Sequence, residues 1–127
     1  MSKELWEQII RYSGKRKDYL KSREQWLKKR GDVVKKLRNW ADKEKKEVDV
    51  DEKIAKKELE KMKLAQEKVP KKEIEIQKLK AQKMKLHAEM QKLDAEVKSL
   101  ELDIEKLEKA MKKKDEEASH LQVEIPP

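Results

Sequence analysis

The stretch LKAQKMKLHAEMQKLDAEVKSLELDIEKLEKAM, residues 79–111, carries a leucine at every seventh position. In most repeats a second apolar residue follows four positions after the leucine, so the stretch has the two apolar columns of a heptad. A heptad kept over several repeats is typical of a coiled-coil helix, because it forms one narrow apolar stripe that must pack against another helix. We therefore predict a coiled-coil helix over residues 71–121.

The N-terminal third keeps the same period with rings in place of most leucines. One column holds Leu5, Tyr12, Tyr19, Trp26, Val33 and Trp40. The column that follows it directly holds Trp6, Leu20, Leu27, Val34 and Ala41. Two adjacent apolar columns make a stripe wider than a two-stranded coiled coil needs, which suits packing against more than one neighbouring helix. This pattern predicts a helix over about residues 2–47.

The coiled-coil interface should use the apolar columns of both segments. In the leucine segment we expect it to contain Leu79, Leu86, Met90, Leu93, Val97, Leu100, Ile104, Leu107 and Met111. In the aromatic segment we expect Leu5, Ile9, Tyr12, Tyr19, Trp26, Val33, Leu37 and Trp40. The two sets of columns are out of phase, so a discontinuity must separate the two helices.

Two places could hold this discontinuity. In EVDVDEK, residues 47–53, Asp49 is followed three residues later by Glu52, which is the spacing of a capping box. We therefore predict a turn near residues 47–50 and a second helix over 51–121. Pro70 suits the first turn of a helix and also bends helices from within, so this second helix should be kinked or broken there.

These signals divide the chain into four parts: a basic aromatic-heptad helix (1–47), a turn and connecting helix (48–70), a leucine-heptad helix (71–121) and a disordered tail (122–127). Charged residues make up 49% of the sequence and aromatic residues 4%, which leaves too little apolar surface for a wide core. The predicted fold class is all-α. It is an elongated coiled coil whose two long helices form a helical hairpin or part of an oligomeric bundle.

The composition also bears on the compartment. The sequence has no Cys, so disulfides and thiolate metal sites are excluded. It has no uninterrupted apolar stretch of the kind that a signal peptide or a membrane-spanning helix needs. We therefore expect an intracellular protein, cytoplasmic or nuclear.

Charge is distributed unevenly along the chain. Residues 1–86 hold 28 Lys and Arg against 16 Asp and Glu, whereas residues 87–127 hold 7 against 11. Carboxylates flank the leucine columns at Glu89, Asp94, Glu96, Glu101, Asp103 and Glu108. An acidic flank prefers a basic partner. A hairpin folded near residue 48 would set basic residues against basic ones and leave residues 97–111 unpaired, so we expect this partner to be another chain.

The basic N-terminal segment allows two alternative functions. Tyr12, Tyr19 and Trp26 each precede an arginine by four residues, so each guanidinium could stack on its ring. Nucleic acid could then be held by Arg16, Arg23, Arg30, Lys28, Lys29, Lys35 and Lys36. Basic helices that contain Trp also bind anionic membrane surfaces, which is the second alternative.

We expect no enzymatic activity and no cofactor. Neither Gly14 nor Gly31 belongs to a phosphate-binding loop pattern, and His87 and His120 lack metal-ligand spacing. Carboxylates are plentiful, but a narrow helical protein offers no water-poor pocket that would shift their pKa values. The sequence thus predicts a structural protein that oligomerises or binds a protein partner through coiled-coil packing.

Overall fold

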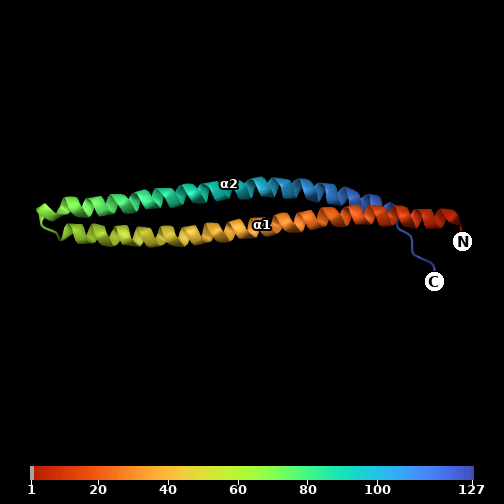
Figure 1. Ribbon diagram of the computed structural model, residues 1–127, viewed down its shortest axis with the longest axis horizontal. Helices are drawn as coiled ribbons and strands as arrows, with labels where there is room; N and C mark the ends of the chain where they lie inside the picture. Colours follow the sequence, from red (N-terminus) through yellow and green to blue (C-terminus); the bar gives the residue numbers. More distant parts are fainter. Residues whose placement is uncertain (1) are drawn as a thin grey trace. The chain divides into compact units, whose positions relative to one another are not determined.

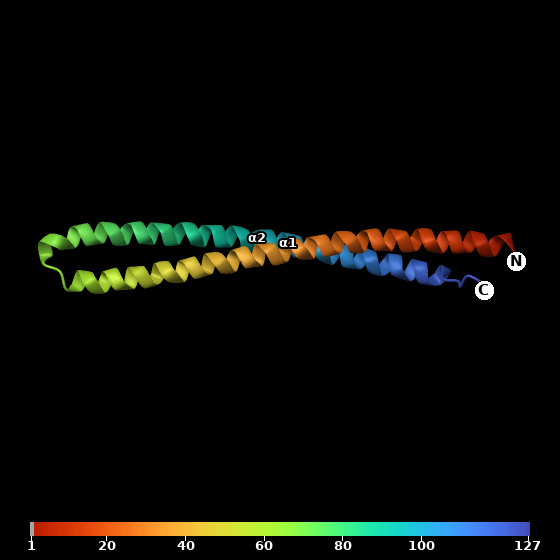
Figure 2. The same cartoon turned by 60° about the horizontal axis from the view of Figure 1, so that its bottom comes forward.

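The computed structural model describes residues 2–127 and contains two long helices. Helix α1 is Lys3–Met62 and helix α2 is Val69–Leu121, with the short 3-10 helix η1, Gln66–Lys68, between them. The two helices pack against each other in opposite directions, as Figures 1 and 2 show. The predicted all-α helical hairpin is therefore confirmed.

The chain divides into two compact units, and each contains a segment of both helices. The first unit combines the described residues up to Val34 with Ser99–Pro127, and the second is Lys35–Lys98. The second unit contains the reversal of the chain, and the first contains both chain ends. Each unit therefore has its own pair of packed helical segments.

The prediction of a turn near residues 47–50 is wrong. Helix α1 continues through this segment to Met62, and Val50 is among the most buried residues of the protein, at 2% exposure. Of the two residues with capping spacing, Asp49 is exposed on α1 and Glu52 forms an ion pair with Lys56, one turn further along the same helix. Capping residues mark a helix start only when the backbone before them leaves the helical conformation.

The chain reverses just before Pro70 instead. Backbone N–H groups of Lys63 and Leu64 donate to the carbonyls of Glu60 and Lys61, which tightens the end of α1. Pro70 is the second residue of α2. The helix that was predicted to be either kinked or broken at Pro70 is therefore broken. The cause is chemical: Pro70 has no N–H to donate, and its ring would collide with the carbonyl of Gln66 in a continuous helix. In the first turn of a helix neither defect matters.

The core is a narrow seam between the helices. In the second unit it contains Val50, Ile76, Leu86, Met90 and Val97, each at most 8% exposed. In the first unit, Ile104 and Ala118 are buried at 5% and 2% exposure, and Ser22 is buried at 6%. After Leu121 the chain has no helix or strand. A two-helix seam buries one side of each helix only, so most other apolar residues remain accessible to solvent.

Candidate interaction surfaces on the two helices

A row of Lys–carboxylate pairs joins the helices along one side of the seam. In the second unit, Nζ of Lys57, Lys43 and Lys36 lies 3.2, 2.7 and 2.6 Å from Oε2 of Glu75, Glu89 and Glu96, respectively. In the first unit, Nζ of Lys29 lies 3.6 Å from Oδ2 of Asp103, and Nζ of Lys15 lies 3.5 Å from Oε2 of Glu117. We call these five pairs the lysine ladder. Its members recur at multiples of seven residues on both helices, so every pair belongs to the same antiparallel register.

The ladder stabilises the charged form of three of its carboxylates, Glu75, Glu89 and Glu96. The hydrogen bond from Lys43 holds the pKa of the Glu89 carboxyl below its ordinary value of 4.5. The Lys36 ammonium lowers the pKa of Glu96 in the same way. On the other side of the seam, the hydrogen bond to Asp51 raises the pKa of Lys83 above 10.5. These groups are therefore charged at neutral pH and hold the hairpin in one register.

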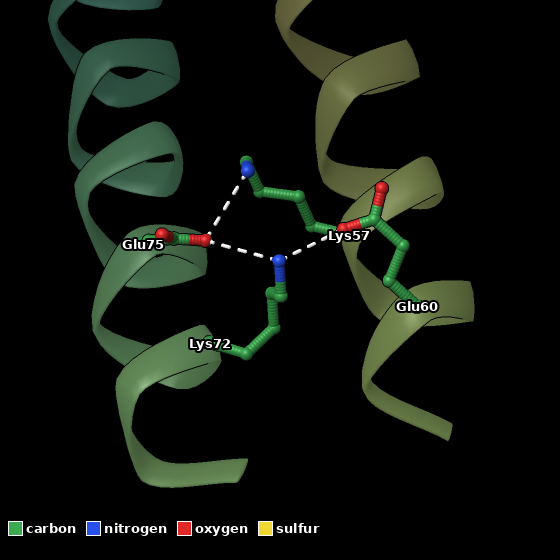
Figure 3. A network of polar contacts seen from close by, with 4 residues as sticks. All are labelled: Lys57, Glu60, Lys72 and Glu75. Atoms are coloured by element: carbon green, nitrogen blue, oxygen red, sulfur yellow. Dashed lines mark hydrogen bonds and ion pairs between the residues drawn. The ribbon is translucent and has the colours of Figure 1, made fainter. Parts of the chain in front are cut away.

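The ladder is reinforced next to the turn by a four-residue network, shown in Figure 3. Oε2 of Glu75 accepts a hydrogen bond from Lys57 at 3.2 Å and forms an ion pair with Lys72 at 3.3 Å. Lys72 also donates to Oε2 of Glu60 at 2.8 Å. The two lysines hold the pKa of the Glu75 carboxyl below 4.5, with Lys57 the larger influence. The network ties the last turns of α1 to the first turns of α2.

On the other side of the seam the rings of α1 lie beside acidic residues of α2. Tyr12, Tyr19, Trp26, Val33 and Trp40 are all half-buried there. In the first unit, Nε1 of Trp26 donates to Oε1 of Glu108 at 3.0 Å, and Nη1 of Arg16 donates to Oδ1 of Asp115 at 3.0 Å. The rings therefore line the seam and stay partly exposed to solvent.

The expected stacking of arginines on rings is only partly correct. Arg30 lies over the Trp26 ring, 5.3 Å from its centroid, as the four-residue spacing predicted. Arg16 lies over Tyr19, 4.5 Å from the centroid, instead of over Tyr12, and also pairs with Asp115 of α2. Arg23 donates to the Tyr19 hydroxyl at 3.2 Å. Each such cation–ring contact contributes about 0.5–1 kcal/mol at a surface.

The residues proposed to contact an anion are thus divided between two environments. Lys29 and Lys36 belong to the lysine ladder, and Arg16 is paired with Asp115. Arg23, Arg30, Lys28 and Lys35 are exposed on α1. Binding of nucleic acid by this segment stays a prediction. The rings of Tyr19 and Trp26 already have a guanidinium over one face.

The second apolar column of α1 does not enter the seam. In the first unit, Trp6, Leu20, Leu27 and Val34 are 42, 46, 54 and 46% exposed. In the second unit, Val48 of the same column is 58% exposed, and Ala41 and Ala55 are also exposed. Leu37, which the sequence placed in the interface, is 48% exposed. Regularly spaced apolar residues on an exposed helix face are typical of a surface that packs against another helix.

The other predicted interface residues lie at different depths. Leu86, Met90, Val97 and Ile104 are buried. The half-buried ones are Leu5, Ile9, Leu79, Leu93, Leu100, Leu107 and Met111. The carboxylates Glu89, Glu96 and Asp103, which were expected to select another chain, pair with lysines of this chain, whereas Asp94 and Glu101 are exposed.

Sequence reasoning missed the lysines of the ladder and the buried residues Ser22, Val50, Ile76 and Ala118. The turn that was predicted near residue 48 would have placed basic residues of the first helix against basic residues of the second. With the reversal before Pro70, the basic half of α1 meets the acidic half of α2. The matched seven-residue spacing of Lys29, Lys36 and Lys43 with Glu89, Glu96 and Asp103 was the signal that could have revealed this register.

No structural feature of residues 2–127 suggests a metal centre or a membrane span. That part of the chain has no group of three or more His, Asp or Glu residues placed to hold a metal ion. Neither α1 nor α2 has a segment both long and apolar enough to cross a bilayer. Comparison with protein-family models, with curated proteins and with solved structures found no match.

Proposed function

We propose that this chain is a non-enzymatic interaction protein that binds a protein partner by helix packing on α1. The observation that carries the proposal is the exposed column of Leu20, Leu27 and Val34 in the first unit, each at least 46% exposed. The hairpin already has a seam, a ladder and a turn network, so this column is not needed to close it. A partner's amphipathic helix laid along it would bury three large side chains at seven-residue spacing.

The contacts of the arginines and rings favour packing over nucleic-acid binding. Arg16 is held by Asp115, and Trp26 by Glu108, so these side chains are already used within the hairpin. Arg23 and Arg30 are exposed and stand three residues after Leu20 and Leu27 of the exposed column, so they would flank a docked helix. Such flanking charges choose the partner and its orientation.

The test compares two variants. One replaces three apolar residues of the exposed column, and the control replaces three exposed lysines next to them in the sequence. In the variant, Leu20→Gln, Leu27→Gln and Val34→Gln remove the apolar surface while keeping helix propensity. The control carries Lys21→Gln, Lys28→Gln and Lys35→Gln, one position further along at exposed sites. Partners co-purified from the source cells are identified, and binding is reconstituted with the purified chain.

We expect the column variant to lose binding of the reconstituted partner by at least tenfold and the lysine control to retain it. Helix content and melting of the hairpin should be unchanged in both variants, because neither set lies in the seam. Equal binding by the column variant and the wild-type chain would show that the exposed column is not the binding surface.

A further inference from the structure

We infer that the exposed side of α1 packs against α1 of a second copy of this chain in the antiparallel direction. The inference rests on the proposed function and names the partner. It comes from a column of α1 at the edge of the seam, in which Arg16 and Asp51 contact α2 and Arg23, Arg30, Leu37 and Glu44 are exposed. Read at every seventh residue, this column is Arg16, Arg23, Arg30, Leu37, Glu44, Asp51 and Glu58. Three arginines precede Leu37 and three carboxylates follow it, at matching distances.

Two patches of opposite charge result, one in each unit. In the first unit, the apolar residues Leu20, Leu27 and Val34 are accompanied by Arg16, Arg23 and Arg30; we call this the basic patch. In the second unit, the acidic patch combines Ala41, Val48 and Ala55 with Glu44, Asp51 and Glu58. Arg23, Arg30 and the three carboxylates each stand three positions after an apolar residue of their patch, and Arg16 stands four positions before Leu20, so all of them lie on the same side of the helix as the apolar residues.

The direction follows from the symmetry of the charges. In an antiparallel pair, Arg30 meets Glu44 of the second copy, Arg23 meets its Asp51, and Arg16 meets its Glu58. Leu37 then lies near Leu37 of the second copy. A parallel pair in register would set arginine against arginine and carboxylate against carboxylate, which is unfavourable. Because α1 is one helix that contains both patches, the antiparallel contact is made twice and closes as a dimer.

The apolar residues fit the same arrangement. In the register that pairs Arg30 with Glu44, two large residues of the basic patch lie nearest small ones of the acidic patch. Val34 lies nearest Ala41 of the second copy and Leu20 nearest its Ala55, while Leu27 lies nearest its Val48. Alternation of large and small side chains lets two helices approach closely. Near Leu37 the surface of the second unit is hollowed by a cavity of about 220 Å³, lined by Leu37, Trp40, Leu93, Asp94 and Val97. An apolar side chain of the second copy could fill it.

The flanking charges are available to a second copy to different degrees. Glu44, Arg23 and Arg30 are exposed. The guanidinium of Arg30 lies over the ring of Trp26 on the same helix. Arg16 and Asp51 have ion-pair partners on α2, so they would share their charges. The pair of Arg30 with Glu44 of the second copy is therefore the best one to test.

The experiment reverses these two charges in the full chain and measures molar mass by sedimentation equilibrium over a range of concentrations. Arg30→Glu alone, or Glu44→Arg alone, creates like-charge contacts on both sides of the two-fold axis and should weaken self-association by at least tenfold. The double variant carrying both changes should restore it. Within one chain the two positions are about 21 Å apart along the helix, so only contact between copies explains restoration.

Matched controls separate this effect from net charge and from folding. Lys28→Glu and Asp42→Arg make the same charge changes two residues earlier, at exposed positions on another side of α1. They should leave the molar mass unchanged. Circular dichroism at low concentration checks that every variant forms the hairpin.

A cysteine substitution tests the position of the two-fold axis. The chain has no Cys, so Leu37→Cys introduces a single thiol that should form a disulfide-linked dimer under mild oxidation. Asn39→Cys, exposed on the opposite side of α1, should not. A dimer that is not crosslinked at residue 37, or not restored by the double charge reversal, would overturn the antiparallel geometry.

Failure of this inference differs from failure of the proposed function. A wild-type chain that stays monomeric at several hundred micromolar overturns the homodimer. The proposed function then still stands if the column variant loses a different, reconstituted partner. If that partner binds the column variant normally as well, both proposals fall.

Discussion

Nζ of Lys36 lies 2.6 Å from Oε2 of Glu96, although the two residues are 60 positions apart in the sequence. The pair belongs to the lysine ladder, whose other members lie at multiples of seven residues from it on both helices. A shift of either helix by one residue would break all five pairs together. The ladder therefore selects the register of the hairpin, even though each pair is partly solvated and contributes little alone.

Reversal of this pair should destabilise the hairpin, and double reversal should restore it. Glu96→Lys sets two ammonium groups against each other and is expected to lower the melting temperature by several degrees. Lys36→Glu combined with Glu96→Lys should recover most of the loss. Thermal melts followed by circular dichroism measure both. Glu101→Lys is the control, because Glu101 is exposed and has no role in the ladder; an equal loss there would refute register selection by the ladder.

The stability of the hairpin should fall as the solution becomes acidic. The pKa values of Glu60, Glu75, Glu89 and Glu96 are lowered from 4.5 by hydrogen bonds from lysines. Groups with lowered pKa stabilise the fold above their unfolded pKa, and the contribution is lost as the pH falls through the folded pKa. Melting temperatures should therefore be constant from about pH 6 to 9 and decrease below about pH 4.5.

Alkaline solution should produce a second decrease. The pKa values of Lys61, Lys72 and Lys83 are raised from 10.5 by carboxylate partners. Groups with raised pKa stabilise the fold below their unfolded pKa, and this is lost as the pH rises through the folded value. A variant with Glu89→Gln and Glu96→Gln should show a flatter acid limb and an unaltered alkaline limb. Identical acid limbs in variant and wild type would contradict the assignment.

Glycine at position 14 should weaken the hairpin without serving a packing need. Gly14 lies inside α1, and a Cβ atom built there meets no atom within 4 Å. Gly14→Ala is therefore expected to stabilise the protein by about 1 kcal/mol, because alanine restricts the unfolded chain and favours the helix. Chemical denaturation measures the gain. A loss of stability would mean that a hidden contact requires glycine.

Truncation of an apolar side chain should lower the free energy of unfolding more when the residue is buried in the seam than when it is exposed. Ile104 is 5% exposed, whereas Leu102, two residues earlier on α2, is 60% exposed. Ile104→Ala should lower the free energy of unfolding by about 2–4 kcal/mol. Leu102→Ala should change it by less than about 0.5 kcal/mol. Similar losses from both substitutions would contradict the position of the seam.

The turn shows where local sequence signals misled the prediction. EVDVDEK has polar residues at capping spacing, but its backbone has no proline or glycine to stop a helix. Val50 and Asp51 are instead held in α1 by burial and by Lys83 of α2, and both interactions depend on residues far away in the sequence. Pro70 was the other predicted place for the discontinuity. The chain breaks the helix there because Pro70 has no backbone N–H to donate.

The sequence by itself determined that the chain is all-α, because the heptads at Leu79–Leu107 and at the rings of α1 allow no other regular structure. It also indicated that α1 has more apolar surface than one neighbour can cover. Only the tertiary structure decided which column of α1 faces α2 and which stays exposed. The physical reason is that heptads specify a stripe on each helix, while direction and register depend on the turn and on charge pairs between residues distant in the sequence.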